Sequence, residues 1–336
     1  MRERPPLDPR GVTRRTPLTP AELTREITPA RDVLVLAHLG IPRLAAAGFT
    51  LEVDGMARRP LKVALEALKR RPKVVYKSFH ECAGNPLKPR APTRRIANVI
   101  WGGAALAGLL KEAEPLPAAQ FIWSYGLDYG EFEGACVDAY VKDLPLERAL
   151  AADALLAYEL NGEPLDAEHG FPLRLVVPGF YGTNSVKWLY RITLAERRAD
   201  GPFTTRFYND PIAPSAENPA GGFKPVWQVA PHSVIVYPAP QAAVRLGDAV
   251  EVWGWAWGER PICAVEVSVD GGAVYRRAAL APREQRSWQR FALTWRPQAA
   301  GPARLSSRAI DTGGETQPLL AARNAVYSVE VSVAAR

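Results

Sequence analysis

The residues best suited to chemistry begin with one cysteine. Cys82 stands in the run Ser-Phe-His-Glu-Cys-Ala-Gly-Asn, residues 78–85. A soft thiolate is a natural ligand for a metal held by sulfur, and the Gly and Asn that follow predict a tight turn where backbone can approach a cofactor closely. The alternative is a buried structural thiol, since free cysteine is among the most buried residue types.

A second group of polar residues follows in two short runs. Residues 168–174 read Glu-His-Gly-Phe-Pro-Leu-Arg, and residues 185–187 read Ser-Val-Lys. Arg174 and Lys187 can neutralise a phosphate, the first bidentately and the second as a point charge, while Ser185 and neighbouring backbone N–H groups can donate to the same oxygens. Taken alone, Arg174 could instead be a surface residue at a strand end and His169 a satisfied loop histidine.

Together and in this order, these blocks resemble the sulfite oxidase family of molybdopterin enzymes, from about residue 30 to the C-terminus. The resemblance implies a molybdenum–molybdopterin cofactor, with Cys82 as the metal ligand. It further implies an active-site tyrosine at Tyr208, for which the alternative is a solvent-facing loop aromatic. The cofactor's phosphate and pterin are then expected on His38, Asp128, His169, Arg174, Ser185, Val186 and Lys187.

The sequence departs from the family where arginines are expected to hold an anionic substrate. Leu36 and Leu87 stand at two such positions. Each charge-assisted hydrogen bond lost is worth about 1.5–3 kcal/mol, so the sequence predicts either a poor sulfite oxidase or a less charged substrate. A third substrate-binding arginine is expected in the C-terminal domain, with Arg286 and Arg290 as candidates. The charge missing at Leu36 and Leu87 could come from Arg90, Arg94 and Arg95.

Composition bounds the partners. The chain has 336 residues, 47% of them hydrophobic, and a net charge of +7 without a long basic run, so nucleic-acid binding is not expected. No run approaches the ~20 apolar residues of a membrane span, so no membrane partner is expected either. The N-terminus has no apolar signal region, which predicts a cytoplasmic protein as given, or a periplasmic one if a leader was removed.

The cysteines predict neither a disulfide framework nor haem. The other two cysteines, Cys136 and Cys263, have no motif around them and are expected to be packed free thiols. There is no Cys-x-x-Cys-His run, so no haem is expected and electrons must leave to a separate acceptor such as a cytochrome, or to oxygen. Trp101-Gly102-Gly103, before an expected helix, is too weak a glycine signature for a nucleotide site.

Periodicity predicts an α+β fold. A mixed α/β molybdopterin domain of sulfite oxidase type is followed by an all-β immunoglobulin-like sandwich, because short strands with turn punctuation dominate after residue 226. Residues 148–160 are expected to be helical, and 63–71 have helical spacing. The expected domains are an extended arm (1–30), the molybdopterin domain (31–200), a linker carrying Tyr208 (201–225) and a dimerisation domain (226–336), which implies a homodimer.

We hypothesise from these residues a molybdenum-dependent oxidoreductase that transfers an oxygen atom to sulfite or a related small substrate. One alternative is a reductase that runs the reverse transfer on a sulfoxide-type acceptor. A second is a non-catalytic binding protein that retains the fold, an idea motivated by Leu36 and Leu87 and opposed by the retained Cys82, Arg174 and Lys187.

Overall fold

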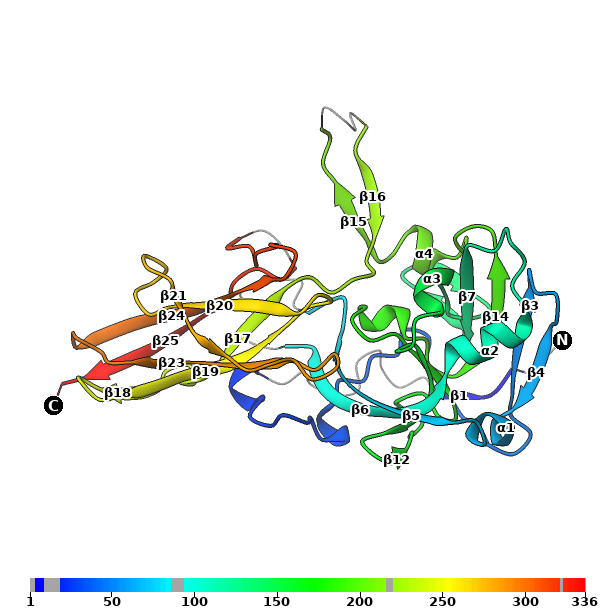
Figure 1. The fold of residues 1–336 in the computed structure, drawn as a ribbon, viewed down its shortest axis with the longest axis horizontal. Helices are drawn as coiled ribbons and strands as arrows, with labels where there is room; N and C mark the ends of the chain where they lie inside the picture. Colours follow the sequence, from blue (N-terminus) through cyan, green and yellow to red (C-terminus); the bar gives the residue numbers. More distant parts are fainter. Residues whose placement is uncertain (1–3, 9–18, 86–93, 216–219, 321–322, 336) are drawn as a thin grey trace. The chain divides into compact units, whose positions relative to one another are not determined.

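A computed structural model describes residues 4–8, 19–85, 94–215, 220–320 and 323–335 (Figure 1). The chain divides into two compact units. Unit 1 comprises residues 1–16, 34–76 and 100–227, and unit 2 comprises residues 17–33, 77–99 and 228–336. Both units are therefore discontinuous in sequence, whereas the sequence pattern predicts consecutive domains. Residues 77–99, which include Cys82, group with the C-terminal sandwich and not with the rest of the expected molybdopterin domain.

Unit 1 is built on two sheets. The first has the strand order β10-β7-β14-β3-β4, in which only β14 and β3 are parallel. Its strands are β3 (Thr50–Gly55), β4 (Leu61–Ala64), β7 (Phe121–Gly126), β10 (Val141–Pro145) and β14 (Leu189–Ala195). The second has the order β12-β11-β6-β5, and β13 also pairs with β11. Its strands are β5 (Lys73–Glu81), β6 (Ile96–Ala105), β11 (Leu155–Leu160), β12 (Glu163–Pro164) and β13 (Arg174–Val176), of which residues 77–81 of β5 and 96–99 of β6 group with unit 2.

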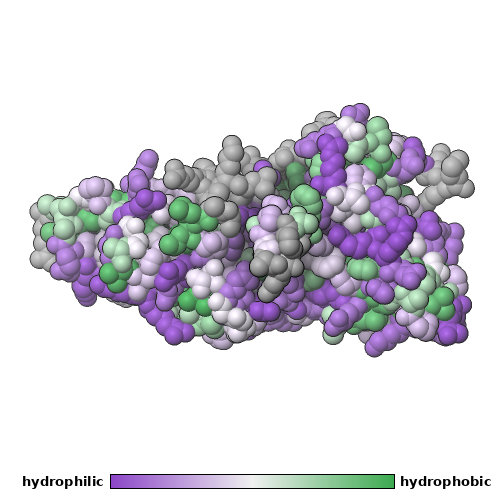
Figure 2. Space-filling view, turned by 90° about the horizontal axis from the view of Figure 1, so that it is seen from above, coloured by the Kyte–Doolittle hydropathy of each residue, from purple (hydrophilic) through white to green (hydrophobic). Residues whose placement is uncertain are grey.

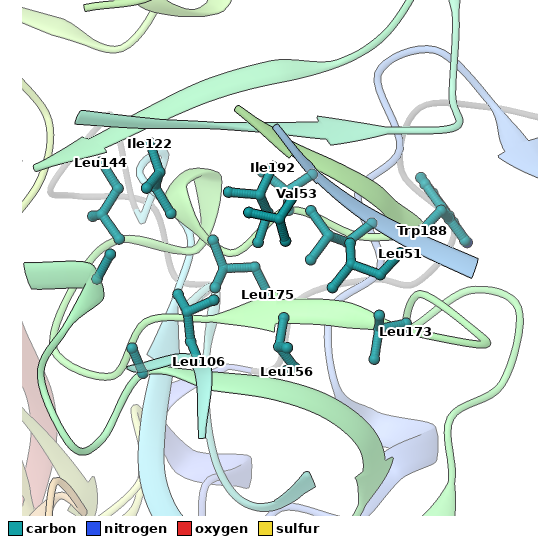
Figure 3. Packing of buried hydrophobic residues seen from close by; sticks show 14 of the residues in the cluster. Leu51, Val53, Leu106, Ile122, Leu144, Leu156, Leu173, Leu175, Trp188 and Ile192 are labelled. Carbon is teal, nitrogen blue, oxygen red and sulfur yellow. The ribbon is translucent and has the colours of Figure 1, made fainter. Parts of the chain in front are cut away.

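The core of unit 1 lies between these sheets. Alternate residues of β3, Leu51 and Val53, are fully buried, as the period of two in an antiparallel or mixed sheet requires. Figure 3 shows Val53 and Ile192 of the first sheet above Leu175 of the second, and all three belong to one apolar cluster. Burial of such side chains, worth about 1.5–3 kcal/mol each, holds the loops between the strands in place.

Four short helices and three small ribbons also occur in the described part of unit 1. The helices are α1 (Leu65–Lys69), α2 (Leu106–Ala113), α3 (Leu146–Ala149) and α4 (Pro202–Thr205). The ribbons are β1 (Leu7–Asp8) with β2 (Ile41–Pro42), β8 (Gly130–Phe132) with β9 (Ala135–Val137), and β15 (Asn209–Ile212) with β16 (Gly222–Pro225). The expected linker 201–225 thus contains a helix and a β-ribbon, and both belong to unit 1.

The expected helix at residues 148–160 is wrong. Helix α3 ends at Ala149, and Leu155–Leu160 form β11, which pairs with β6, β12 and β13. Nearly every residue of β11 is buried, so its sequence lacks the alternation that marks a half-exposed strand. The helix expected at 63–71 is likewise shortened to α1, because residues 61–64 pair with β3.

The run Trp101-Gly102-Gly103 lies inside strand β6 rather than in a loop before a helix. A Cβ atom on Gly103 would collide with the carbonyl oxygen of Leu156 on β11. Glycine is needed here because the two strands approach closely, which explains this residue without a nucleotide.

Unit 2 is centred on a sandwich of two sheets. One has the order β17-β19-β23-β22, and the other has the order β18-β25-β24-β20-β21. The strands are β17 (His232–Tyr237), β18 (Ala243–Arg245), β19 (Val250–Trp257), β20 (Ile262–Ser268), β21 (Arg276–Arg277), β22 (Ala279–Leu280), β23 (Gln289–Trp295), β24 (Gly301–Asp311) and β25 (Ser328–Ala334). Val252 and Phe291 of one sheet share a core with Val265 and Leu305 of the other. The predicted pairing of a mixed α/β domain with an all-β sandwich is confirmed.

Short 3-10 turns occur at Pro20–Glu22, Ala30–Asp32 and Gly182–Asn184. The first opens with a capping box between Thr19 and Glu22.

On the face shown in Figure 2, hydrophobic residues lie scattered among hydrophilic ones. The large apolar side chains that are exposed among the described residues come from several elements: Val75, Ile212, Phe223, Tyr237, Val274, Leu319 and Leu320. Among the residues described, no helix is both long and apolar enough to cross a membrane.

Candidate cofactor site

Two buried cations mark the candidate anchor for a cofactor in unit 1. Arg174 opens β13 and Lys187 stands just before β14, and both side chains are largely buried. Gly170 lies between them with φ +106°, and a Cβ atom at this position would stand 3.1 Å from Cβ of Lys187 and 3.2 Å from Cβ of Arg174. A side chain at residue 170 would therefore press on the bases of both cationic side chains, in a backbone conformation that favours glycine.

Backbone carbonyl groups orient both cations. Arg174 donates from Nη1 to the carbonyl of His169 (2.9 Å) and from Nη2 to that of Ser185 (3.1 Å). Lys187 donates from Nζ to the carbonyls of Leu36 (2.9 Å) and Glu168 (3.1 Å). Three separate segments thus meet at these two side chains. The predicted juxtaposition of Arg174, Lys187 and His169 is present in the structure.

Burial makes the positive charges costly. It lowers the pKa of Arg174 to about 9. Burial also lowers the pKa of Lys187, with repulsion from Arg174 as the second cause. Neutral carbonyl groups solvate these charges only in part, so an anion bound beside them would raise both pKa values. A phosphate group fits this electrostatic environment.

His169 adds a directed polar atom to the same cluster. Its Nδ1 lies 2.8 Å and 2.9 Å from the two carboxylate oxygens of Asp166, which can only accept, so Nδ1 is the donor, and in the tautomer with this single proton Nε2 is an acceptor. His169 is 3% exposed, and its Nε2 has no hydrogen-bond partner among the described residues. A buried nitrogen in this state is suited to a ligand that supplies an N–H or O–H group.

Asp128 interacts electrostatically with Lys187 of this cluster. Burial raises the pKa of its carboxyl, and attraction to Lys187 opposes the rise. Its Oδ1 would collide with a Cβ atom on Gly126, so the glycine leaves the space that the carboxylate occupies. An ionised Asp128 could accept hydrogen bonds from the donor edge of a pterin, and attraction to Lys187 favours that ionised form.

Ser185 and Val186 have structural contacts. Ser185 Oγ accepts a hydrogen bond from the N–H of Val177 (3.0 Å), which still leaves its hydroxyl hydrogen to donate. Val186 packs its side chain into the apolar cluster, and its carbonyl accepts from the N–H of Leu175. Any cofactor contact from Val186 therefore has to be made by its backbone.

Tyr208 and His38 form a hydrogen-bonded pair within unit 1. Tyr208 Oη lies 2.7 Å from His38 Nε2, and the tyrosine backbone has φ +58°. The imidazole is enclosed by aromatic rings, with Phe132 at 4.5 Å and Phe203 at 5.6 Å between ring centroids. Burial, followed by repulsion from Lys187, lowers the pKa of His38 to about 4, so the ring is neutral at pH 7. Tyr208 is not a solvent-facing loop aromatic; its ring packs against the core of unit 1.

The Cys82 turn belongs to unit 2 and follows directly after β5. The residue is partly exposed, and its sulfur accepts a hydrogen bond from the N–H of Gly84 (3.4 Å). Burial raises the pKa of Cys82, and the hydrogen bond from Gly84 and the charge of Arg95 oppose the rise. Among the described residues no three His, Cys, Asp or Glu side chains gather at one place as a metal site would require. A metal at Cys82 would therefore have to bring its other ligands with a cofactor.

The arginines expected to bind substrate have different surroundings. Arg286 donates to Glu259 and Arg290 to Glu251, so the charge of each candidate is balanced by a carboxylate. Arg94 is buried with its guanidinium 4.3 Å from the Tyr327 ring centroid. Arg95 acts electrostatically on Cys82. Leu87 and Arg90 lie outside the described residues.

The expectation that Cys136 and Cys263 are packed in the interior is wrong. Cys136 and Cys263 are exposed rather than packed, since each sits on an outward position of its strand.

Sequence reasoning did not find Asp166, whose carboxylate orients His169, or Glu81, whose carboxylate accepts from Asn85 in the Cys82 turn. An Asp three residues before a His, or a Glu before a Cys, is too common a spacing to have singled them out.

Comparison with known proteins agrees with this chemistry. The family model described as the oxidoreductase molybdopterin binding domain matches residues 38–203, and that described as the Mo-co oxidoreductase dimerisation domain matches residues 224–332. Sulfite oxidase of Gallus gallus is 32% identical over 326 residues, which cover 89% of this chain and 70% of that protein. Mitochondrial sulfite oxidase of Mus musculus is also 32% identical, and the match covers 89% of this chain and 59% of that protein.

A solved structure shows the same fold. The sulfane dehydrogenase SoxCD from Paracoccus pantotrophus superposes with a TM-score of 0.78 at 27% identity, covering 94% of this chain and 85% of the other. Both family models, the two sulfite oxidases and this structure point to the same family. The chain belongs to the sulfite oxidase family of molybdopterin-dependent oxidoreductases.

Proposed function

We propose that this enzyme oxidises a small sulfur compound by oxygen-atom transfer, with sulfite as the first candidate, and passes the electrons to a separate acceptor. Oxidation of sulfite to sulfate takes one oxygen from water and releases two electrons and two protons. The molybdenum cofactor, when bound, supplies the two-electron oxygen-atom transfer, while the protein supplies binding, orientation and control of protons.

The observation that carries this proposal is the buried pair Arg174 and Lys187 beside His169, whose Nε2 has no hydrogen-bond partner within the described part of the chain. In this proposal the two cations bind the cofactor's phosphate, and Asp128 and His169 accept from its pterin donors. Ser185 donates its hydroxyl to the phosphate, and backbone N–H groups around Val186 add to these contacts. Cys82 supplies the thiolate ligand of the metal.

The Tyr208–His38 pair controls a proton. A neutral imidazole can accept the hydroxyl proton of Tyr208 or donate its own to the hydroxyl oxygen, because the two atoms are 2.7 Å apart. In the proposed reaction Tyr208 holds the substrate or the water-derived oxygen by a hydrogen bond. His38 keeps the hydroxyl oriented and moves its proton.

Arg95 is the proposed cation for an anionic substrate. Its charge acts on Cys82, whereas Arg286 and Arg290 have carboxylate partners. Arg95 would thus provide the positive charge that is absent at Leu36. Replacement of Arg95 by Gln should raise the Michaelis constant for sulfite more than it lowers kcat, since the contact is made in the ground state as well.

A second candidate substrate is sulfane sulfur, which carries less charge at the reacting atom. Leu36 favours it, because an apolar side chain stands where the family has an arginine. The similarity to a sulfane dehydrogenase points the same way. The separate electron acceptor and a homodimer made through the dimerisation-type domain are further parts of the proposal.

Steady-state oxidation with an artificial electron acceptor tests the proposal. Wild-type enzyme loaded with molybdenum should oxidise sulfite or thiosulfate, and Cys82→Ser should retain its fold by circular dichroism but lose turnover. Cys136→Ser is the matched control, because it removes an exposed thiol. Full turnover in Cys82→Ser would refute the role of this thiolate. A monomer by light scattering at micromolar concentration would refute the dimer.

A further inference from the structure

Glu81, the residue before Cys82, is a buried carboxylate that the proposed reaction does not use. It ends β5 and is 1% exposed. A buried carboxylate costs free energy unless its oxygens receive hydrogen bonds, and an apolar residue of similar size often serves stability equally well. Stability alone therefore does not explain a glutamate at this position, directly before the proposed metal ligand.

The Glu81 carboxylate joins the Cys82 turn to the sandwich. Its Oε2 accepts from Trp257 Nε1 (2.8 Å) and its Oε1 from Asn85 Nδ2 (2.7 Å), while His232 Nδ1 lies 3.4 Å from Oε1. His232 and Trp257 are register partners on β17 and β19, with ring centroids 4.7 Å apart. All four side chains belong to unit 2.

Asn85 carries this contact to the backbone of the thiol. It is fully buried, and its Oδ1 accepts from the N–H of Arg95. The carbonyl of Arg95 in turn accepts from the N–H of Cys82 (2.9 Å). Glu81, Asn85, Arg95 and Cys82 thus form a closed ring of covalent and hydrogen bonds. The backbone of Cys82 is thus linked to Asn85 through Arg95.

We propose that Glu81 is a positioning residue that fixes the orientation of the Cys82 thiolate through Asn85. The inference rests on the proposed role of Cys82 as metal ligand. If Glu81 only stabilised the sandwich through Trp257 and His232, its replacement would lower stability and leave the metal–thiolate bond unchanged. Partners that orient a ligand without touching the metal typically affect activity by about 10–100-fold when replaced.

The hydrogen-bond polarity allows a test by exchange. In Glu81→Gln, the amide can accept from Trp257 or from Asn85, but its NH₂ group then faces the other donor. In Asn85→Asp, two carboxylates face each other. When the two substitutions are combined, the new amide at position 81 accepts from Trp257 and donates from its NH₂ group to the new carboxylate at position 85. That carboxylate still accepts from the N–H of Arg95. The double exchange therefore restores the ring with the polarity of the bond between positions 81 and 85 reversed. His232 Nδ1, which lies 3.4 Å from the atom that becomes the amide nitrogen, then faces a donor and can accept from it in the other tautomer.

The readout is the electron paramagnetic resonance spectrum of pentavalent molybdenum in the loaded enzyme, with turnover per molybdenum alongside. Each single variant should shift the g-values and lower turnover by about 10–100-fold, and the double variant should recover both. Gln289→Glu is the matched control, since it perturbs a buried side chain that bonds to Ile262 and Ala281 of the same sandwich. It should lower the melting temperature without shifting the spectrum.

Wild-type g-values in both single variants would overturn the inference. If a single variant fails to fold or to load molybdenum, the double variant decides. A loaded double variant with the wild-type spectrum supports the inference, and any other result overturns it. Cys82→Ser separates the two proposals: an unchanged spectrum there refutes Cys82 as ligand, whereas a changed spectrum with unaltered Glu81 variants refutes only the role of Glu81.

Discussion

The hydroxyl of Tyr208 lies 2.7 Å from Nε2 of His38, although 170 residues separate them in the chain. This bond joins a residue just before β2 to one that follows helix α4, and both belong to unit 1. The histidine is neutral at pH 7 because its pKa is lowered to about 4. The pair can therefore share a proton without carrying a net charge.

Removal of the Tyr208 hydroxyl should separate catalysis from packing. Tyr208→Phe keeps the ring against the core, so stability should fall by only about 1 kcal/mol, while kcat should fall by about 10²-fold if the hydroxyl handles a proton. Tyr140→Phe is the control, since that hydroxyl lies 2.7 Å from Thr183 Oγ1 within the same aromatic group. Equal kcat values in the two variants would contradict the role of Tyr208.

The lowered pKa of His38 predicts a pH-dependent stability. Since the folded pKa is about 4 and the reference value is 6.5, the unfolded chain binds more protons between these pH values. The contribution is therefore complete above about pH 6.5 and is lost as pH falls toward 4, by up to about 3 kcal/mol. Denaturant unfolding at pH 7.5 and pH 5 should show a larger loss in wild type than in His38→Gln. Equal losses in both proteins would argue against a buried, neutral His38.

Arg174→Ala should impair cofactor retention more than folding. The variant removes one of two buried cations and leaves Lys187 with a less depressed pKa, because repulsion from Arg174 disappears. Molybdenum per chain after gel filtration should fall severalfold. Arg148→Ala is a matched control in the same unit, since Arg148 is also largely buried and bonds to Asp153 and the carbonyl of Pro178. Equal molybdenum content in the two variants would show that Arg174 is not the anchor.

Leu36→Arg tests the apolar substitution at the family's arginine position. One charge-assisted bond should lower the Michaelis constant for sulfite by the equivalent of ~1.5–3 kcal/mol. The gain should come with some loss of stability, because the new side chain joins a segment whose carbonyl already binds Lys187. Leu36→Met, similar in volume and uncharged, should leave the constant near its wild-type value. If the arginine weakens sulfite binding instead, another group such as Arg95 already supplies the charge.

Sequence patterns predict elements well where one face is exposed. The alternation at residues 49–55 predicts β3, and the Asp-Gly-Gly run at 270–272 predicts the turn between β20 and β21. Leu155–Leu160 could not be assigned in this way, since a strand buried on both faces has no alternation. The grouping of residues 77–99 with the sandwich depends on long-range packing that no local pattern encodes.

Some residues of the candidate site could likewise be predicted from the sequence, and others could not. The family resemblance predicts roles for Cys82, Arg174 and Lys187, and the residue types suit those roles. Asp166 and Glu81 could not be predicted, since their role depends on which side chains lie opposite them in the fold. The hydrogen bond between Tyr208 and His38 is equally invisible in sequence, although both residues were expected near the cofactor.

Gly170 has no Cβ atom, and this leaves space beside the Cβ atoms of Lys187 and Arg174. With φ +106°, and with Lys187 and Arg174 each too near for an unstrained side chain, this position is closed to other residue types. Around it, the apolar residues of the core can exchange for one another at modest cost. A substitution at residue 170 would therefore act on both cationic side chains at once, because the same added atom would press on Lys187 and Arg174.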